Sequence, residues 1–167
     1  MKRQDIVIGF VILALVGGSI YLVQRRRGDK PEEMKVPQTL SVEEKLEESF
    51  KIEIPEDVNK VELKDVSGGK ALGIATRKFE NGRFEHTILA DLPDPEVGVF
   101  YEGWLVKGEE GKEGFSLIST GRLRLAKGGY LLEFRSSTDY SDHNKVVVTS
   151  EKVADKKPET HILEGSF

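Results

Sequence analysis

Three histidines are the side chains in this sequence best suited to hold a metal or move a proton near neutral pH. His86 lies in a predicted strand, His143 lies in a polar loop beside Asp139 and Asp142, and His161 begins the last predicted strand. A zinc site needs such residues brought together with a carboxylate. Because nothing in their spacing requires them to meet, we predict no metal ligands.

The most polar segment, Thr138–Asn144, contains oxygen-bearing side chains of the kind that bind calcium. The candidate ligands are Asp139, Asp142 and Asn144. An EF-hand loop also needs a glycine at a fixed place after its acidic residues, and this segment has none. We therefore predict an Asx-rich turn that connects two strands.

Nucleophilic catalysis finds little support in the sequence. The chain has no cysteine, which excludes disulfides, thiolate zinc sites and cysteine nucleophiles. The sequence contains the residue types of a Ser-His-Asp triad, but it has no Gly-x-Ser-x-Gly elbow and no glycine-rich phosphate loop. We predict no catalytic residues, no cofactor and no enzyme activity, with a metal-dependent hydrolase as the least favoured alternative.

The charge balance limits the partners of the chain. The formal net charge is -4 and the sequence pI is about 5.5. General nucleic-acid binding needs a basic face, so nucleic acid is not a predicted partner.

Period-two alternation begins at Val58 and predicts a β-rich domain. Two strand-like runs, Ala71–Glu80 and Arg83–Leu89, are joined by Asn81 and Gly82, the strongest short hairpin signal because both turn residues need a positive φ. The other predicted strands are Val58–Val66, Val99–Lys107, one or two within Phe115–Ala126, Tyr130–Arg135, Lys145–Val153 and His161–Phe167. About eight short strands without helical crossovers predict an antiparallel sandwich.

A short helix is predicted before the strands, over Ser41–Ser49. Ser41 and Glu44 have the spacing of a capping box. Val42, Leu46 and Phe50 recur every four residues and form one apolar stripe.

An uncharged apolar segment, Ile6–Val23, precedes these elements. As a helix its roughly 18 residues would be about 27 Å long, close to the thickness of a bilayer's hydrocarbon core. A cleaved signal peptide is the nearest alternative, but its apolar region usually runs ~7–15 residues. A buried core helix is disfavoured because no other segment is apolar enough to surround it. We predict an uncleaved single-pass transmembrane anchor.

An ordered series of short motifs runs from Leu89 to Phe167, about half of the chain. The motifs are Ala90–Pro95 (ADLPDP), Tyr101–Val106 (YEGWLV), Ser119–Gly121 (STG), Lys145–Glu151 (KVVVTSE), Pro158 and Ile162–Gly165 (ILEG). The series resembles the C-terminal extracytoplasmic domain of bacterial anti-sigma-K factors. The resemblance implies an Ig-like β-sandwich outside a bacterial plasma membrane.

Anti-sigma factors of this kind hold the sigma factor with a cytoplasmic helical domain that precedes the membrane helix. Here only Met1–Asp5 precede the apolar segment, and five residues cannot fold around a partner. The resemblance is therefore extended to the sensor-like ectodomain alone, and direct binding of a sigma factor is not expected.

Four parts of the chain are predicted: a cytoplasmic tail (1–5), a transmembrane anchor (6–23), a flexible linker (24–40) and an extracytoplasmic β-sandwich domain with a short N-terminal helix (41–167). The positive-inside rule points the other way, because Arg25, Arg26 and Arg27 follow the anchor and favour a cytoplasmic C-terminal domain. The resemblance favours the outside, and we adopt that orientation.

These observations predict a non-enzymatic, membrane-anchored binding or sensing module that recognises a protein or envelope component. The loops Gly108–Gly114 and Ser136–Asn144 are its predicted contact surface. The alternative is a structural or accessory envelope subunit that pairs with another membrane protein through helix 6–23. Trp104 is expected to be a core residue rather than a ligand platform, and Gly121 and Gly165 suit bulges or close strand approach.

The orientation is testable by protease treatment of intact cells or spheroplasts that express the chain with a tag after Phe167. An extracytoplasmic domain predicts loss of the tag without lysis. Survival of the tag until lysis would show that the arginine cluster sets the orientation and that the domain is cytoplasmic.

Overall fold

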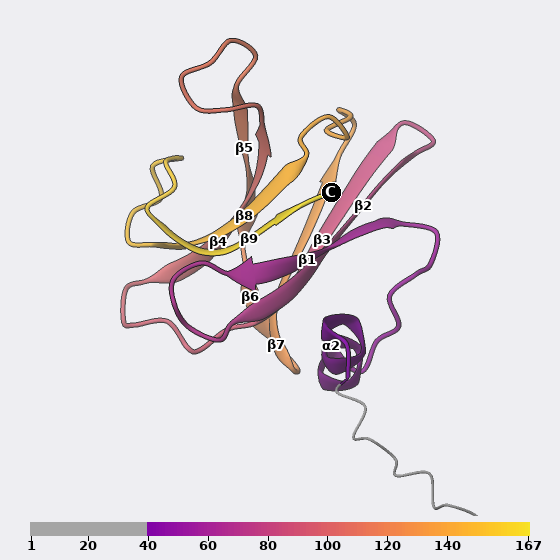
Figure 1. Cartoon of the computed structure of the whole chain (residues 1–167), viewed down its shortest axis with the longest axis vertical. Helices are drawn as coiled ribbons and strands as arrows, with labels where there is room; N and C mark the ends of the chain where they lie inside the picture. Colours follow the sequence, from indigo (N-terminus) through magenta and orange to yellow (C-terminus); the bar gives the residue numbers. More distant parts are fainter. Residues whose placement is uncertain (1–39) are drawn as a thin grey trace, which may run out of the picture. The chain divides into compact units, whose positions relative to one another are not determined.

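The computed structural model describes residues 40–167 (Figure 1). The predicted tail (1–5), the predicted anchor (6–23) and all but the last residue of the predicted linker (24–40) lie outside the described residues. Within residues 40–167, no helix is long and apolar enough to cross a membrane. This part of the chain is mainly β with one helix, which confirms the predicted class.

Helix α2 (Val42–Phe50) begins where the capping box predicts. The Ser41 hydroxyl accepts a hydrogen bond from the Glu44 N–H at 3.1 Å, and the Glu44 carboxylate accepts one from the Ser41 N–H at 2.7 Å. Two of the N–H groups at the start of the helix are thus satisfied reciprocally. The helix ends at Lys51, whose φ of 56° places it in the left-handed region.

Nine strands follow the helix, and every hydrogen-bonded pair of neighbours is antiparallel. They are β1 (Asn59–Asp65), β2 (Leu72–Glu80), β3 (Arg83–Asp91), β4 (Phe100–Lys107), β5 (Ser116–Arg122), β6 (Arg124–Ala126), β7 (Gly129–Ser136), β8 (Lys145–Glu151) and β9 (Thr160–Ser166). Their order across the sheet is β5-β4-β8-β9-β1-β2-β3-β7-β6.

The predicted hairpin between β2 and β3 is confirmed. The two strands pair along their whole length, from Leu72 opposite Asp91 to Glu80 opposite Arg83. The turn residues Asn81 and Gly82 have φ values of 53° and 73°, as a type I′ turn requires.

The two glycines singled out in the sequence also lie where predicted. Gly121 has a φ of 107° and follows an irregularity in the β4–β5 register. At Gly165, a Cβ atom would lie 2.6 Å from the backbone oxygen of Glu62, so only glycine lets β9 approach β1 this closely.

The sheet curls until it is nearly closed, with β5 from one edge lying against β7 near the other (Figure 1). The expected Ig-like sandwich has two separate sheets, whereas here the described strands form one continuous sheet. The inner face of the curled sheet encloses the main core. Its buried members are Leu63, Ala75, Phe84, Ile88, Ala90, Leu92, Tyr101, Leu105, Leu123, Tyr130, Leu132, Val146, Val148 and Leu163.

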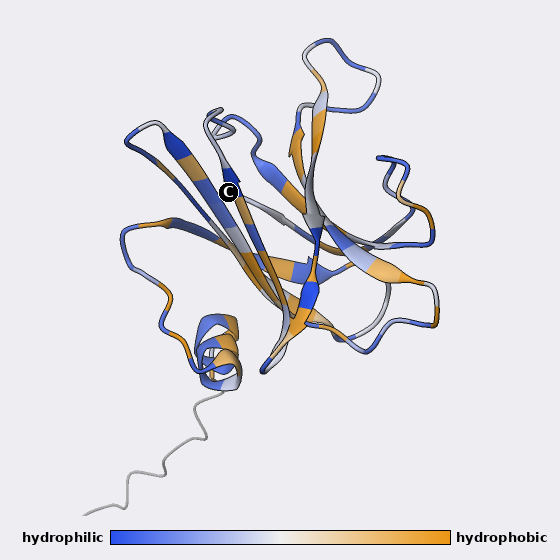
Figure 2. Ribbon diagram, turned by 180° about the vertical axis from the view of Figure 1, so that it is seen from behind, coloured by the Kyte–Doolittle hydropathy of each residue, from blue (hydrophilic) through white to orange (hydrophobic). Residues whose placement is uncertain are grey.

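The outer face of β2, β3 and β7 is covered by α2. Leu46 and Phe50 of the helix form a second apolar cluster with Ile54, Ile74 and Leu89. Figure 2 shows the underlying pattern, in which apolar and polar residues alternate along the strands. The predicted stripe on α2 is therefore the face that packs on the sheet.

The outer face of β4 and β8 has no covering helix, yet it contains Trp104. Its neighbours Gly103 and Leu105 face the main core, so the Trp104 side chain points outward. Trp104 is 1% exposed and belongs to neither apolar cluster. It is buried as expected, but on the opposite side of the sheet from the main core.

His86 of β3 is a buried histidine whose pKa lies far from its ordinary value. It is 1% exposed, and its Nδ1 atom lies 2.8 Å from the Thr76 carbonyl oxygen. Burial lowers the pKa of His86 from 6.5 to about 4, despite the opposing effect of the Thr76 hydrogen bond. The imidazole is neutral at pH 7 and donates to Thr76 from Nδ1.

This shift makes the stability of the domain depend on pH. The unfolded chain takes up a proton on His86 near pH 6.5, whereas the folded chain does so only near pH 4. The contribution of His86 to stability is therefore complete above pH 6.5 and declines as the pH falls toward 4. Urea unfolding of the full chain should lose about 2–3 kcal/mol more between pH 7.5 and 4.5 in the wild type than in His86→Leu. Equal losses in wild type and variant would contradict the buried neutral imidazole; His161→Leu serves as the exposed-histidine control.

Candidate functional site

The structure does not bring the three histidines together. His86 is in the middle of β3, His143 lies between β7 and β8, and His161 lies on β9. Among residues 40–167, no group of three histidine, aspartate or glutamate side chains is placed to hold a metal ion.

The predicted Asx-rich turn uses its side-chain oxygens for local bonds. The Asp139 carboxylate accepts a hydrogen bond from the Ser141 N–H at 2.8 Å. Asn144 accepts one from the Arg77 guanidinium at 3.4 Å, and Arg77 also donates to the His143 carbonyl at 2.9 Å. Burial lowers the pKa of Arg77, while nearby aspartates oppose that shift. This part of the Ser136–Asn144 loop is fixed to the domain.

Three residues at the base of this loop have the connectivity of a catalytic triad. The His143 Nε2 atom lies 3.0 Å from the Ser116 hydroxyl, and its Nδ1 atom lies 2.7 Å from an Asp142 carboxylate oxygen. The sequence held the residue types but gave no sign of this pairing, because Ser116 is far from the other two along the chain and lies in no catalytic motif. Hydrogen-bond distances alone would allow proton transfer from serine to histidine.

The surroundings of Ser116 do not match those of a nucleophile. Neither Ser116 nor His143 lines either of the two hollows described below. The Asp142 side chain is 54% exposed and forms a 2.6 Å ion pair with Lys107, which is the main cause of its lowered pKa. The His143 ring packs edge-on against Tyr140, 5.3 Å between centroids. We interpret the three hydrogen-bonded residues as a clasp that fixes the loop to the start of β5.

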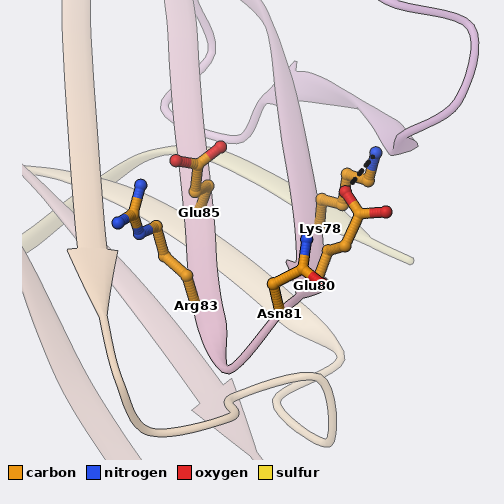
Figure 3. A pocket seen from close by; sticks show the side chains of 5 residues that line it. All are labelled: Lys78, Glu80, Asn81, Arg83 and Glu85. Atoms are coloured by element: carbon orange, nitrogen blue, oxygen red, sulfur yellow. Dashed lines mark ion pairs between the residues drawn. The ribbon is translucent and has the colours of Figure 1, made fainter.

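A polar hollow of about 390 Å³ lies at the tip of the β2–β3 hairpin (Figure 3). Its lining residues are Lys78, Glu80, Asn81, Arg83 and Glu85. Lys78 forms ion pairs with Asp57 at 2.6 Å and with Glu80 at 2.9 Å, and the hydrogen bonds that it donates to these carboxylates raise its pKa. Lys78 and Glu80 are paired with each other and Glu85 is paired with Arg135 at 3.6 Å, which leaves Arg83 without a salt bridge among the described residues.

A larger groove of about 710 Å³ lies on the outer face of the β5-β4-β8-β9 part of the sheet. Its floor is apolar and consists of Trp104, Val106, Leu117 and Val147. Trp104 and Val147 are direct cross-strand partners on β4 and β8. The volume falls within the range of about 300–1,000 Å³ that is typical of ligand sites.

The Trp104 ring is held in place by a polar network on the same face of the sheet. Its indole N–H donates to the Thr149 hydroxyl at 2.7 Å, and that hydroxyl lies 3.4 Å from the Glu102 carbonyl oxygen. The Glu102 carboxylate in turn accepts a hydrogen bond from the Ser119 hydroxyl. Because the buried indole has its hydrogen-bond partner, the orientation of the Trp104 ring is fixed.

Two connections form the walls of the groove. One is the β4–β5 loop, whose Gly108 and neighbouring residues line the groove and which contains tight turns such as the 3.0 Å bond from the Lys112 N–H to the Glu109 carbonyl. The other is the β8–β9 loop, where the Glu159 carboxylate accepts hydrogen bonds from the N–H groups of Lys152 and Val153 at 3.1 and 3.0 Å. Internal hydrogen bonds fix both loops. This favours binding because the loops lose little conformational entropy when a ligand binds.

The charged residues of the groove fall into a paired and an unpaired set. Lys145 and His161 share the Glu164 carboxylate at 2.6 and 2.5 Å. Burial alone would raise the pKa of Glu164, but the hydrogen bonds from Lys145 and His161 outweigh it and lower that pKa. The unpaired set consists of groove residues without a salt bridge to any described residue: Glu109, Glu110, Lys156 and Lys157.

One of the two loops predicted as a contact surface lines the groove and the other does not. Gly108–Gly114 contributes Gly108, Glu109 and Glu110 to its wall, whereas no residue of Ser136–Asn144 lines it. The β8–β9 loop was not anticipated, although its consecutive Lys156, Lys157 and Pro158 are a visible signal of an exposed basic turn. No family model, curated protein or solved structure matches this chain.

The clasp interpretation of Ser116 predicts that this serine is unreactive. A fluorophosphonate probe, which labels serines activated by a neighbouring base, should leave the full chain unlabelled while it labels a serine hydrolase in the same mixture. Labelling at Ser116 that disappears in His143→Gln would instead identify an active triad and contradict our interpretation.

Proposed function

We propose that this protein is a non-enzymatic binding module, tethered to a membrane by residues 6–23, which recognises a protein partner in the groove over Trp104. The observation that supports this proposal most is a groove of about 710 Å³ with a partly apolar floor, in which Val106 and Leu117 are half-buried and Trp104 and Val147 are almost fully buried. The other half of the outer face, over β2 and β3, is covered by α2, so a groove open to solvent is not a general property of this face.

The fixed positions of the groove residues support a binding role rather than an incidental exposure of apolar side chains. Trp104 and Val147 lie on neighbouring strands that are each paired on both sides, and the Trp104 indole is fixed by Thr149. Exposed apolar patches framed by polar loops are typical of interaction surfaces.

The membrane tether and the sensor-like role come from the sequence. The apolar segment Ile6–Val23 and the motifs that resemble the anti-sigma-K ectodomain support an extracytoplasmic module of a bacterial plasma membrane. The Ig-like relationship belongs to this proposal as well: the single curled sheet encloses its core between two facing halves, as a sandwich does. A sigma-binding role stays outside the proposal.

The groove as the partner site is testable by site-specific photocrosslinking in the cells that express the protein. A photoreactive amino acid in place of Leu117, on the groove floor, should give a discrete light-dependent adduct. The same amino acid in place of Leu125, which is 71% exposed on β6, is the matched control and should give none.

Equal adduct patterns from both positions would indicate collisional labelling and would contradict a specific groove. Absence of any adduct at Leu117, with adducts at Leu125, would move the partner site to the β6 edge of the sheet.

A further inference from the structure

The unpaired charges of the groove are arranged by sign. Glu109 and Glu110 belong to the β4–β5 loop, while Lys156 and Lys157 belong to the β8–β9 loop. All four residues are exposed, and none of them forms a salt bridge within the described residues. One wall of the groove is therefore acidic and the other basic, with the apolar floor between them.

The backbone of the floor is not available to a ligand. β4 is hydrogen bonded on both sides, to β5 and to β8, and β8 is hydrogen bonded to β4 and to β9. A partner cannot add a strand at this place, so recognition must use side chains above the sheet. An occupant needs an apolar group for the floor and opposite charges at its two ends.

We infer that the groove binds an extended segment of a partner protein in which a large apolar side chain is flanked by acidic residues on one side and basic residues on the other. The acidic residues contact Lys156 and Lys157, and the basic residues contact Glu109 and Glu110. A polypeptide supplies these three features in sequence on one chain. A nucleic acid does not fit, because its phosphates would face the acidic wall. This inference rests on the proposed function and adds the chemistry of the ligand.

The test is a selection of random heptapeptides, displayed on phage, against the full chain in mild detergent. Parallel selections use Lys156→Glu/Lys157→Glu, Glu109→Lys/Glu110→Lys, and the control Lys64→Glu/Lys70→Glu, whose exposed lysines lie outside the groove. Wild type and control should enrich the same acidic–apolar–basic pattern. Each groove variant should enrich peptides in which the charge facing the altered wall is reversed.

Affinity gives the quantitative form of the same test, measured by fluorescence polarisation of a labelled wild-type-selected peptide. Because two exposed charge pairs are lost, Lys156→Glu/Lys157→Glu should weaken binding by about 2- to 30-fold. Replacing the acidic residues of the peptide by lysine should restore binding to that variant, and the control variant should bind as wild type does.

A further variant, Leu117→Asp, separates failure of this inference from failure of the proposed function. The enriched peptides could fail to bind Leu117→Asp but bind both charge-reversal variants as they bind wild type. That result would overturn the charge pattern and leave the groove as the binding site. Absence of any enriched peptide, or enrichment that survives Leu117→Asp, would overturn both.

Discussion

The structure depends on the fact that a sheet has two faces, each of which exposes apolar side chains unless something covers it. The nine strands solve this problem for one face by curling until that face encloses itself. Leu105, Leu132 and Val146 come from three different strands and are all buried within the resulting core. The outer face then has to be protected piece by piece, and its two halves are treated differently.

Over β2, β3 and β7 the protection is a helix. The capping box at Ser41 starts α2 at the residue that places Leu46 and Phe50 against Ile74 and Leu89. Over β4 and β8 there is no helix, and Trp104, which is 1% exposed, is fixed by its hydrogen bond to Thr149 on the same face of the sheet. The result is a rigid apolar floor between an acidic and a basic wall. This difference between the two halves of the outer face connects the fold to the proposed binding.

Local features of this domain could be read from the sequence because they depend on neighbouring residues. The positive φ of Asn81 and Gly82 specifies the β2–β3 hairpin, and the spacing of Ser41 and Glu44 specifies the start of α2. The candidate site could not be read in this way. It depends on which face of β4 points outward, and alternation alone does not distinguish the two faces of a strand that is buried on both sides.

The other differences between the sequence predictions and the structure arise from contacts between residues that are far apart along the chain. The closure of the sheet depends on the meeting of β5 and β7, which no local pattern encodes. The same is true of the clasp, since Ser116 and His143 meet only after β5 and β8 have paired with β4. Loop Ser136–Asn144 looked like a contact surface because it is polar. Its polar side chains largely form hydrogen bonds with Arg77 and with the backbone of the loop itself.

The most direct test of the binding groove uses the fact that the chain contains a single tryptophan. In a ¹⁵N–¹H NMR spectrum of the full chain in micelles, the indole N–H of Trp104 gives one isolated signal, and a peptide enriched on the wild-type chain can be titrated against it. A ligand in the groove should shift this signal, with the same dissociation constant that fluorescence polarisation gives, and should leave the amides of Asn81 and Gly82 unchanged. A bound peptide that leaves the Trp104 indole signal in place would show that the groove is not the binding site.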